Sequence, residues 1–242
     1  MSKKTCAIIL AGGQGKRMKS DLPKPMFRVL DMPMLDWVTR ACEEAGISDI
    51  CVVTGFNSEV IEKHLDGKYH TVFQPQRMGT GHAVMMALDW LSERRDSDVL
   101  ILNGDAPFID RDTVLGAHAL HEEKGNAVTV ITSEVDDPYG YGRIIRTQDG
   151  ISGIVEEKDA TAEQKNIREI NSGAYWFDTE KLIFALGEIK PNNSQGEYYL
   201  TDSVFILINA KFRADAYISS NPDTVLGAND RKGLLLLNNT AR

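Results

Sequence analysis

The chain has 242 residues, 42% of them hydrophobic, and a formal net charge of −8 from 27 basic and 35 acidic side chains. A chain of this size and composition folds around its own core, which excludes a disordered or fibrous protein, and its apolar runs fall far short of the ~18 residues that a membrane-spanning helix needs. The acidic total argues against nucleic-acid binding. Cys6, Cys42 and Cys51 are predicted to be reduced core thiols. We therefore expect a cytoplasmic protein with neither a nucleic-acid nor a membrane partner.

The first half of the chain alternates short runs rich in Val and Ile with longer amphipathic stretches, which is typical of parallel strands joined by helices. The expected strands are residues 5–10, 49–54, 69–74, 98–102 and 127–133. Apolar residues at helical spacing predict helices at residues 34–45, 57–65, 81–91 and 112–123. Asn57 and Asp112 are the expected N-caps of the second and fourth helices, and Gly46 is expected to end the first.

After residue 134 the regular alternation breaks into shorter elements. We expect strands at residues 139–145, 150–157, 169–177 and 214–218, and helices at residues 179–185 and 197–209. Because no linker, repeat or low-complexity stretch is present, one domain over residues 1–242 is favoured over two. The predicted fold class is α/β, with a Rossmann-like, mainly parallel central sheet, flanking helices and a mixed α+β second half.

The first predicted strand runs directly into a glycine-rich, basic loop, LAGGQGKRM at residues 10–18. Ligands of parallel sheets bind at the carboxyl ends of strands, and glycines let backbone N–H groups approach an anion closely. Lys16, Arg17 and Lys24 add positive charge, so a small polyanion is the expected partner; a solvated basic turn is the alternative. The loop is neither a Walker A motif nor a dinucleotide fingerprint, because Leu10 and Met18 occupy positions where those motifs need glycine.

This loop, followed by Leu22-Pro23-Lys24, resembles the signature of the sugar-1-phosphate nucleotidylyltransferases. Further motifs of that family match in order and spacing, at residues 79–83 (GTGHA), 103–105 (NGD), 141–144 (YGRI), 154–156 (IVE) and 169–173 (EINSG). Residues 193–202 and 227–231 are similar to the uridylyltransferase half of bacterial bifunctional N-acetylglucosamine-1-phosphate uridylyltransferase/glucosamine-1-phosphate acetyltransferases. The resemblance extends from residue 5 to about residue 235, and it implies the nucleotide-diphospho-sugar transferase type of the α/β fold.

The resemblance implies an enzyme that transfers UMP from UTP to N-acetylglucosamine 1-phosphate, giving UDP-N-acetylglucosamine and pyrophosphate for cell-wall precursor synthesis. It implies a nucleotide-binding half (residues 1–133), a sugar-binding half (134–230) and a C-terminal helical tail (231–242). The β-helix that carries acetyl transfer and builds the trimer in the family is not in this sequence, so we expect no acetyl transfer and a monomer or weak dimer. Residues 234–237 are four successive leucines, and those that cannot face inward either dock on the domain or form an intermolecular contact.

The resemblance also assigns roles to individual residues. Arg17 and Lys24 are the implied catalytic cations, on the triphosphate and the α-phosphate respectively, and Asp105 and Asn229 are the implied Mg²⁺ ligands. The implied substrate-binding residues are Leu10, Ala11, Gly12, Gly13, Gln74, Gly79, Thr80, Asn103, Gly104, Asp105, Gly142, Glu156, Asn171 and Asn229. Of these, residues 74, 79 and 80 match positions that read the uracil, and residues 142, 156 and 171 match positions that bind the N-acetylglucosamine moiety.

Other interpretations of the same residues remain open. The chain could be a related nucleotidyltransferase with a different sugar or base, or a UDP-sugar sensor without turnover. Lys16 and Gly12 replace a threonine and an alanine that are common in the family, so substrate affinity could differ. Without the resemblance, Gln74 would be a polar strand end and Glu156 part of an exposed strand face. The sequence shows no Ser-His-Asp arrangement and no clustered zinc ligands, and its helical histidines, at positions 82, 118 and 121, are predicted to be structural or solvated.

Overall fold

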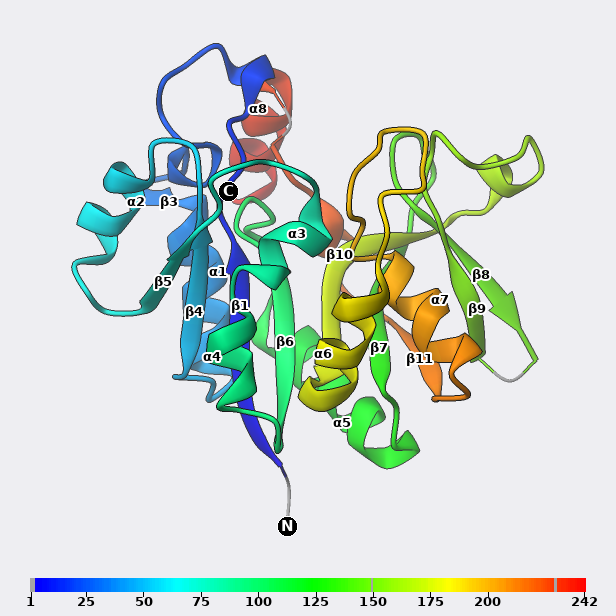
Figure 1. Ribbon diagram of the computed structural model, residues 1–242. Helices are drawn as coiled ribbons and strands as arrows, with labels where there is room; N and C mark the ends of the chain where they lie inside the picture. The colour runs from blue at the N-terminus through cyan, green and yellow to red at the C-terminus, as the bar shows by residue number, and fades with distance from the viewer. Residues whose placement is uncertain (1–2, 149, 229) are drawn as a thin grey trace.

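The structure is a computed structural model that describes residues 3–148, 150–228 and 230–242 (Figure 1). Within these residues one nine-stranded sheet has the order β11-β7-β10-β6-β1-β4-β5, with β8 paired to β10 and β9 paired to β8. Its strands are β1 (Lys4–Leu10), β4 (Ile50–Thr54), β5 (His70–Phe73), β6 (Ser97–Asn103), β7 (Val128–Glu134), β8 (Arg143–Thr147), β9 (Gly150–Val155), β10 (Glu169–Asp178) and β11 (Ala214–Ile218). A separate two-stranded sheet pairs β2 (Arg28–Val29) with β3 (Met32–Pro33).

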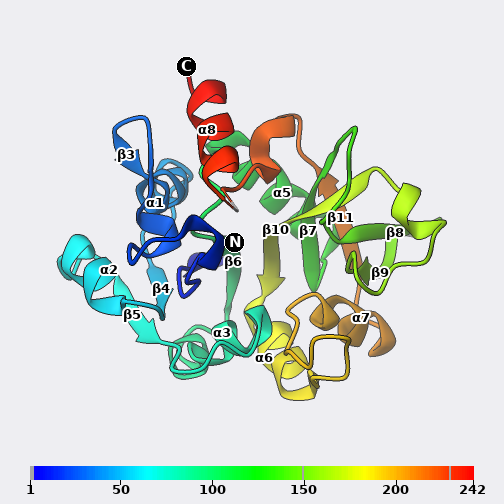
Figure 2. The ribbon, with the colours of Figure 1, turned by 90° about the horizontal axis from the view of Figure 1, so that it is seen from above.

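The helices lie on both faces of the large sheet. They are α1 (Met34–Glu44), α2 (Ser58–Leu65), α3 (Thr80–Met85), α4 (Leu88–Ser92), α5 (Arg111–Lys124), α6 (Thr179–Glu188), α7 (Asp202–Asn209) and α8 (Arg231–Thr240), with single 3₁₀ turns η1 (Lys16–Met18), η2 (Lys24–Met26), η3 (Gln164–Asn166) and η4 (Pro222–Val225). Seen from above, α3, α6 and α7 lie on one side of the sheet and α5 on the other (Figure 2). None of the helices in the described part of the chain is both long and apolar enough to cross a membrane.

Strand direction decides which loops meet. Strands β1, β4, β5 and β6 are mutually parallel, so their carboxyl ends share one edge of the sheet, uppermost in Figure 1. Strand β10 is antiparallel to both β6 and β7, so it begins at the edge where β6 ends. The predicted mainly parallel, Rossmann-like sheet with a mixed second half is confirmed.

The core forms two layers, one on each face of the sheet. Side chains alternate along a strand, so in β1 Cys6 and Ile8 pack with α3, α4, α6 and α7, while Ala7 and Ile9 pack with α1, α2 and α5. Burial on both faces explains why the strands are continuous hydrophobic runs in the sequence. The three cysteines are free and buried, as predicted.

Three predicted elements have different bounds. The helix expected at residues 81–91 is two helices, because the backbone N–H of Ala87 bonds to Val84 O in a tight 3₁₀-type turn that ends α3. The helix expected at residues 197–209 starts only at Asp202, since the residues before it follow the positive φ of Gly196 and form a loop. The strand expected at residues 139–145 starts at Arg143, after a turn at Gly140, whose φ is +87°.

One predicted helix cap was wrong, and a second holds the N-cap position without capping the helix through its side chain. Asp110, not Asp112, caps α5, because its Oδ1 accepts a hydrogen bond from the backbone N–H of Thr113 at 2.7 Å. Asn57 does precede α2, but its side chain donates to the backbone oxygen of Asp21 instead of capping the helix. The prediction for Gly46 is confirmed: it follows α1 with φ +83°.

The leucines of α8 divide as an amphipathic helix requires. Leu237 is buried and Leu234 partly buried against the β2–β3 region, whereas Leu235 and Leu236 are 63% and 52% exposed. The side chain of Asn238 fixes the helix there, because its Oδ1 accepts from the backbone N–H of Leu30 at 2.8 Å.

Candidate active site

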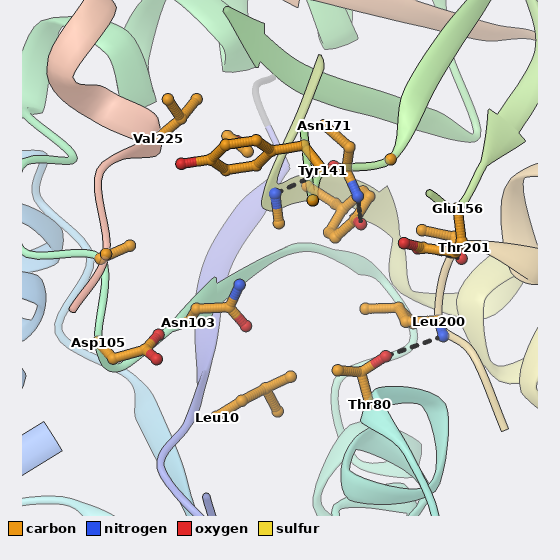
Figure 3. Close-up of a pocket in the computed structure, with 17 residues that line it drawn as sticks. Leu10, Thr80, Asn103, Asp105, Tyr141, Glu156, Asn171, Leu200, Thr201 and Val225 are labelled. Carbon is orange, nitrogen blue, oxygen red and sulfur yellow. Dashed lines mark hydrogen bonds between the residues drawn. The ribbon is translucent and has the colours of Figure 1, made fainter. Parts of the chain in front are cut away.

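Two adjoining cavities, of about 430 and 260 Å³, open at the shared edge where β1 and β6 end. We call the larger the first cavity and the smaller the second cavity; the second is drawn in Figure 3. Five residues line both of them, namely Leu10, Thr80, Asn103, Asp105 and Glu156. The two cavities therefore form one cleft that joins the glycine-rich loop to the second half of the chain.

The glycine-rich loop forms one wall of the first cavity. Gly12 and Gly13 line it, and a Cβ at Gly12 would lie 3.1 Å from Gln74 Oε1 and 3.3 Å from Thr54 O. Glycine at this position thus lets the loop pass directly over the end of β4. Ala11 lies behind the lining and is buried, with its N–H bonded to Val53 O at 2.8 Å.

Gln74 is a buried amide at the far end of the first cavity. Its Nε2 donates to Gly79 O at 3.2 Å and lies 3.0 Å from His82 Nδ1. Because both N–H groups are used in this way, the amide carbonyl is the group left for a ligand. His82 thus contacts Gln74 through its ring, and the prediction that this histidine is structural or solvated stays a prediction.

Lys24 and Asp105 meet at the junction of the two cavities. The ammonium group of Lys24, on η2, forms an ion pair with the carboxylate of Asp105, which follows β6. The side chains are 13% and 26% exposed, so this pair is partly shielded from solvent. Gly104, just behind the lining, ties the two strand ends together through its N–H bond to Leu10 O at 2.9 Å. The cleft thus places a cation and a hard oxygen donor at its centre.

The second cavity is lined by acceptor and amide groups from the second half of the chain (Figure 3). Glu156 accepts a hydrogen bond from Thr201 Oγ1 at 3.2 Å, and burial raises the pKa of its carboxyl group, with nearby acidic groups acting in the same direction. Gly142 lies beside it, where a Cβ would come within 3.0 Å of Ile154 Cγ2. The oxygen of Gly142 accepts from the backbone N–H of Asn171 at 2.9 Å.

The loop before α7 joins both cavities. Tyr198 bonds to the turn at the start of α3: its oxygen accepts from Gly81 N and its N–H donates to Met78 O, both at 2.8 Å. Gly79 has φ +105°, and a Cβ there would lie 2.4 Å from Tyr198 O, so only glycine fits. Three residues further along, Thr201 contacts Glu156 in the second cavity.

Most predicted site residues line the cleft, and a few do not. Leu10, Gly12, Gly13, Lys24, Gln74, Gly79, Thr80, Asn103, Asp105, Gly142, Glu156 and Asn171 do. Arg17 is exposed on η1 and lines neither cavity. Asn229, the second implied metal ligand, lies outside the described residues.

Several lining residues were not predicted. Arg77 lines the first cavity and donates from Nη1 to Gln14 Oε1 at 2.9 Å, which connects it to the glycine-rich loop. One sign of this role was present in the sequence, because Arg77 is a cation that lies between Gln74 and Gly79, two positions that match the family's uracil-binding residues. Tyr175 and Thr201 line the second cavity.

A group of potential metal ligands lies at the opposite edge of the sheet, where β6 begins. Asp98, His118 and Glu122 bring ligand atoms within 4.8 Å of one another, although the sequence showed no such cluster. Burial alone would raise the pKa of Asp98, but His118 and His121, with the charge of Lys3, hold that pKa well below its usual range. Contacts with Lys3 and the two histidines therefore account for this buried carboxylate, and the prediction that His118 and His121 are structural or solvated stays a prediction.

A Rossmann-like sheet with a divided, cation-bearing cleft at the carboxyl ends of its strands is the architecture of nucleotide-binding α/β enzymes. The chain belongs to the nucleotidyl transferase family, which residues 6–221 match. The family resemblance found in the sequence is thereby confirmed.

Curated relatives and solved structures agree with this assignment. The chain is 46% identical to the bifunctional protein GlmU of Caldanaerobacter subterraneus subsp. tengcongensis and 43% identical to that of Acetivibrio thermocellus. Each alignment spans 226 residues and covers 93% of this chain and 49% of the relative. It therefore spans about half the length of these relatives. A putative glucose-1-phosphate thymidylyltransferase from Bacillus anthracis, in complex with a sucrose, has a TM-score of 0.81 at 21% identity, over 99% of this chain and 96% of that one. A UDP-glucose pyrophosphorylase complexed with UDP-glucose has a TM-score of 0.78 at 20% identity, over 100% and 98%. At these identities the solved structures show a shared fold.

Proposed function

We propose that this chain transfers UMP from UTP to N-acetylglucosamine 1-phosphate, which gives UDP-N-acetylglucosamine and pyrophosphate, a cell-wall precursor reaction of the cytoplasm. The observation that carries the proposal is the position of Lys24 and Asp105, at the junction between a cavity with a buried amide and one with Glu156 and Asn171. The identity of the chain to the GlmU proteins supports the choice of substrates.

The reaction needs no nucleophilic side chain. A phosphate oxygen of the sugar phosphate attacks the α-phosphorus of UTP, a new P–O bond forms, and the bond to the β-phosphate breaks so that pyrophosphate leaves with the electron pair. The attacking oxygen is already anionic, so no general base is required. The protein therefore contributes positioning and charge stabilisation.

Lys24 is the residue best placed for charge stabilisation. Its ammonium group lies where the two substrates would meet, and the limited exposure of its side chain lowers the local screening by water. Arg17, exposed on the η1 turn after the start of the glycine-rich loop, is proposed to neutralise the triphosphate. Gly13 leaves open space beside the loop in the first cavity, because a Cβ there would meet no atom within 4 Å.

Asp105 is proposed to hold Mg²⁺, with Asn229 as a second ligand. The partly exposed carboxylate at the junction suits this ion, which takes one or two carboxylates and completes its shell with water and phosphate oxygens. When bound, the ion supplies positive charge to the phosphate oxygens.

Recognition of the two substrates follows from the hydrogen-bonding groups in the cavities. The Gln74 carbonyl can accept from N3–H of uracil, whereas cytosine presents an acceptor at that position. Glu156 can accept from sugar hydroxyl groups, and the Asn171 amide can contact an acetamido group. A base or sugar that lacks the matching group leaves a buried polar atom unpaired, which costs binding free energy.

A pyrophosphate-release assay tests the function directly. We expect turnover with UTP and N-acetylglucosamine 1-phosphate in Mg²⁺, and much slower turnover with CTP or glucose 1-phosphate. A faster reaction with another nucleotide or sugar would identify a different nucleotidyltransferase, and UDP-sugar binding without turnover would identify a sensor. Light scattering in the same buffer checks the proposed monomer or weak dimer; a stable trimer would contradict it.

A further inference from the structure

Tyr175 stands out among the residues of the second cavity because its ring is in the core and its hydroxyl reaches the site. The side chain is 3% exposed and packs with other buried residues of β10, yet Tyr175 lines the cavity. Asn171, four residues earlier on the same strand, donates from Nδ2 to Tyr175 Oη at 2.5 Å. The pairing of β10 with β7 shifts register between Asn171 and Ala174, so this irregularity of the strand lies between the two hydrogen-bonded residues in the sequence.

The amide of Asn171 is held at both of its ends. Its Oδ1 accepts from the backbone N–H of Gly173 at 3.0 Å, while its Nδ2 is held by Tyr175. Only glycine fits at position 173, because its φ is +79° and a Cβ there would clash with the side-chain amide of Asn103. The amide orientation is therefore set, and the second N–H of Nδ2 remains to donate to a ligand.

The Tyr175 hydroxyl uses a lone pair for Asn171, so it keeps its own proton as a donor. Burial raises the pKa of this hydroxyl, which keeps it neutral and protonated at physiological pH. The carboxylate of Glu156, an acceptor, lines the same cavity. The cavity thus offers fixed donors, on Asn171 and Tyr175, for the carbonyl oxygen of an acetamido group. It also offers an acceptor, Glu156, for the N–H of that group.

We propose that Tyr175 is a positioning residue that orients Asn171 and so makes the second cavity select acetamido sugars over sugars with a hydroxyl at the same carbon. The proposal rests on the function proposed above. A hydroxyl oxygen lies two bonds closer to the sugar ring than an acetamido carbonyl oxygen does, so in the same pose it would not reach the fixed N–H of Asn171, and that donor would lose its ligand partner. Without the tyrosine oxygen, only the backbone N–H of Gly173 still orients the Asn171 amide, and the preference for acetamido sugars should fall.

The test is the Tyr175→Phe variant, which removes one oxygen and leaves the ring in the core. Calorimetric titration with UDP-N-acetylglucosamine, UDP-glucose and UDP measures binding without turnover. Loss of one hydrogen-bonded oxygen should weaken UDP-N-acetylglucosamine binding about 5- to 10-fold, with UDP-glucose and UDP affected less than about twofold. In kinetics, KM for N-acetylglucosamine 1-phosphate should rise by the same factor while kcat changes little.

Tyr217→Phe is the matched control, because Tyr217 lies on β11 and lines neither cavity. It should leave all three affinities unchanged. A Tyr175→Phe protein that keeps its preference, or loses affinity for both sugars equally, would overturn the role of Tyr175. A wild-type protein that binds UDP but does not prefer the acetamido sugar would instead contradict the proposed function.

Discussion

Replacing Lys24 by methionine tests the central electrostatic argument. The stem of Lys24 lies against the backbone of Gly15, where a Cβ would come within 3.1 Å of Lys24 Cβ, and methionine keeps that stem while removing the ammonium group. The variant should therefore fold normally. Lys24→Arg, which keeps a positive charge at the same place, is the matched control.

The magnitude follows from the location of the charge. At ~4 Å and an effective dielectric constant of about 20, two unit charges interact by about 4 kcal/mol. As the bond to pyrophosphate breaks, negative charge builds on the leaving oxygen next to the α-phosphorus, so most of this interaction is gained in the transition state. We expect Lys24→Met to lower kcat by about 10² to 10³, with KM for UTP raised less than about fivefold.

Steady-state pyrophosphate release with each substrate varied in turn separates the two constants. Circular dichroism and thermal unfolding of the variant check that the fold is intact. Partial recovery of kcat in Lys24→Arg would support the charge argument. A change confined to KM, with kcat within about threefold of wild type, would refute it and assign the lysine to substrate binding alone.

Three other predictions concern single residues of the cleft. Asp105→Ala should lower kcat in Mg²⁺ by about a thousandfold and shift Tm by less than about 2 °C; activity within tenfold of wild type would remove Asp105 from the site. Burial raises the pKa of the Glu156 carboxyl group above 4.5, so the folded state holds this proton more tightly than the unfolded state, and the free energy of unfolding falls as pH rises through the folded pKa. The Glu156→Gln variant should lack this fall. Thermal unfolding of both proteins between about pH 4 and 7 would therefore show a Tm difference that grows with pH in favour of the variant. Arg77→Gln should raise KM for UTP about 5- to 10-fold at low salt and less at high salt. The control Arg40→Gln, which removes the cation of the exposed Arg40–Glu44 pair on α1, should leave KM for UTP unchanged. An equal rise of KM in both variants would show that the net charge of the protein, not the position of Arg77, determines the effect.

Most strands of the first half could be predicted because they are buried on both faces, whereas β5, at the edge of the sheet, is exposed or only partly buried throughout. Residues 5–10 are a continuous apolar run for that reason, and a run of that kind followed by glycines indicates a strand that ends at a ligand site. The direction of β10 could not be predicted in the same way. The burial pattern of residues 169–178 is compatible with either direction, and the antiparallel pairing with β6 depends on the chain path between them.

The candidate site was predictable where chemistry and local motif coincide, as at Lys24 and Asp105. Tyr175 has the sequence character of a core aromatic, and only the tertiary structure shows its hydroxyl beside Asn171. The group of potential metal ligands at Asp98 includes His118, twenty residues further along the chain, so no short sequence motif predicts that these side chains meet. The cap at Asp110 was missed because two aspartates lie close together and local sequence does not distinguish them.

The contact between Tyr198 and the turn before α3 limits how this protein could be redesigned. The turn from Gln74 to Gly81 and the loop that ends at Thr201 share backbone hydrogen bonds and a contact that tolerates only glycine. A library that varies the turn to accept a new base would therefore also displace the loop that carries the partner of Glu156. Engineered variants of base and sugar preference would have to be selected together, with both segments treated as one unit of design.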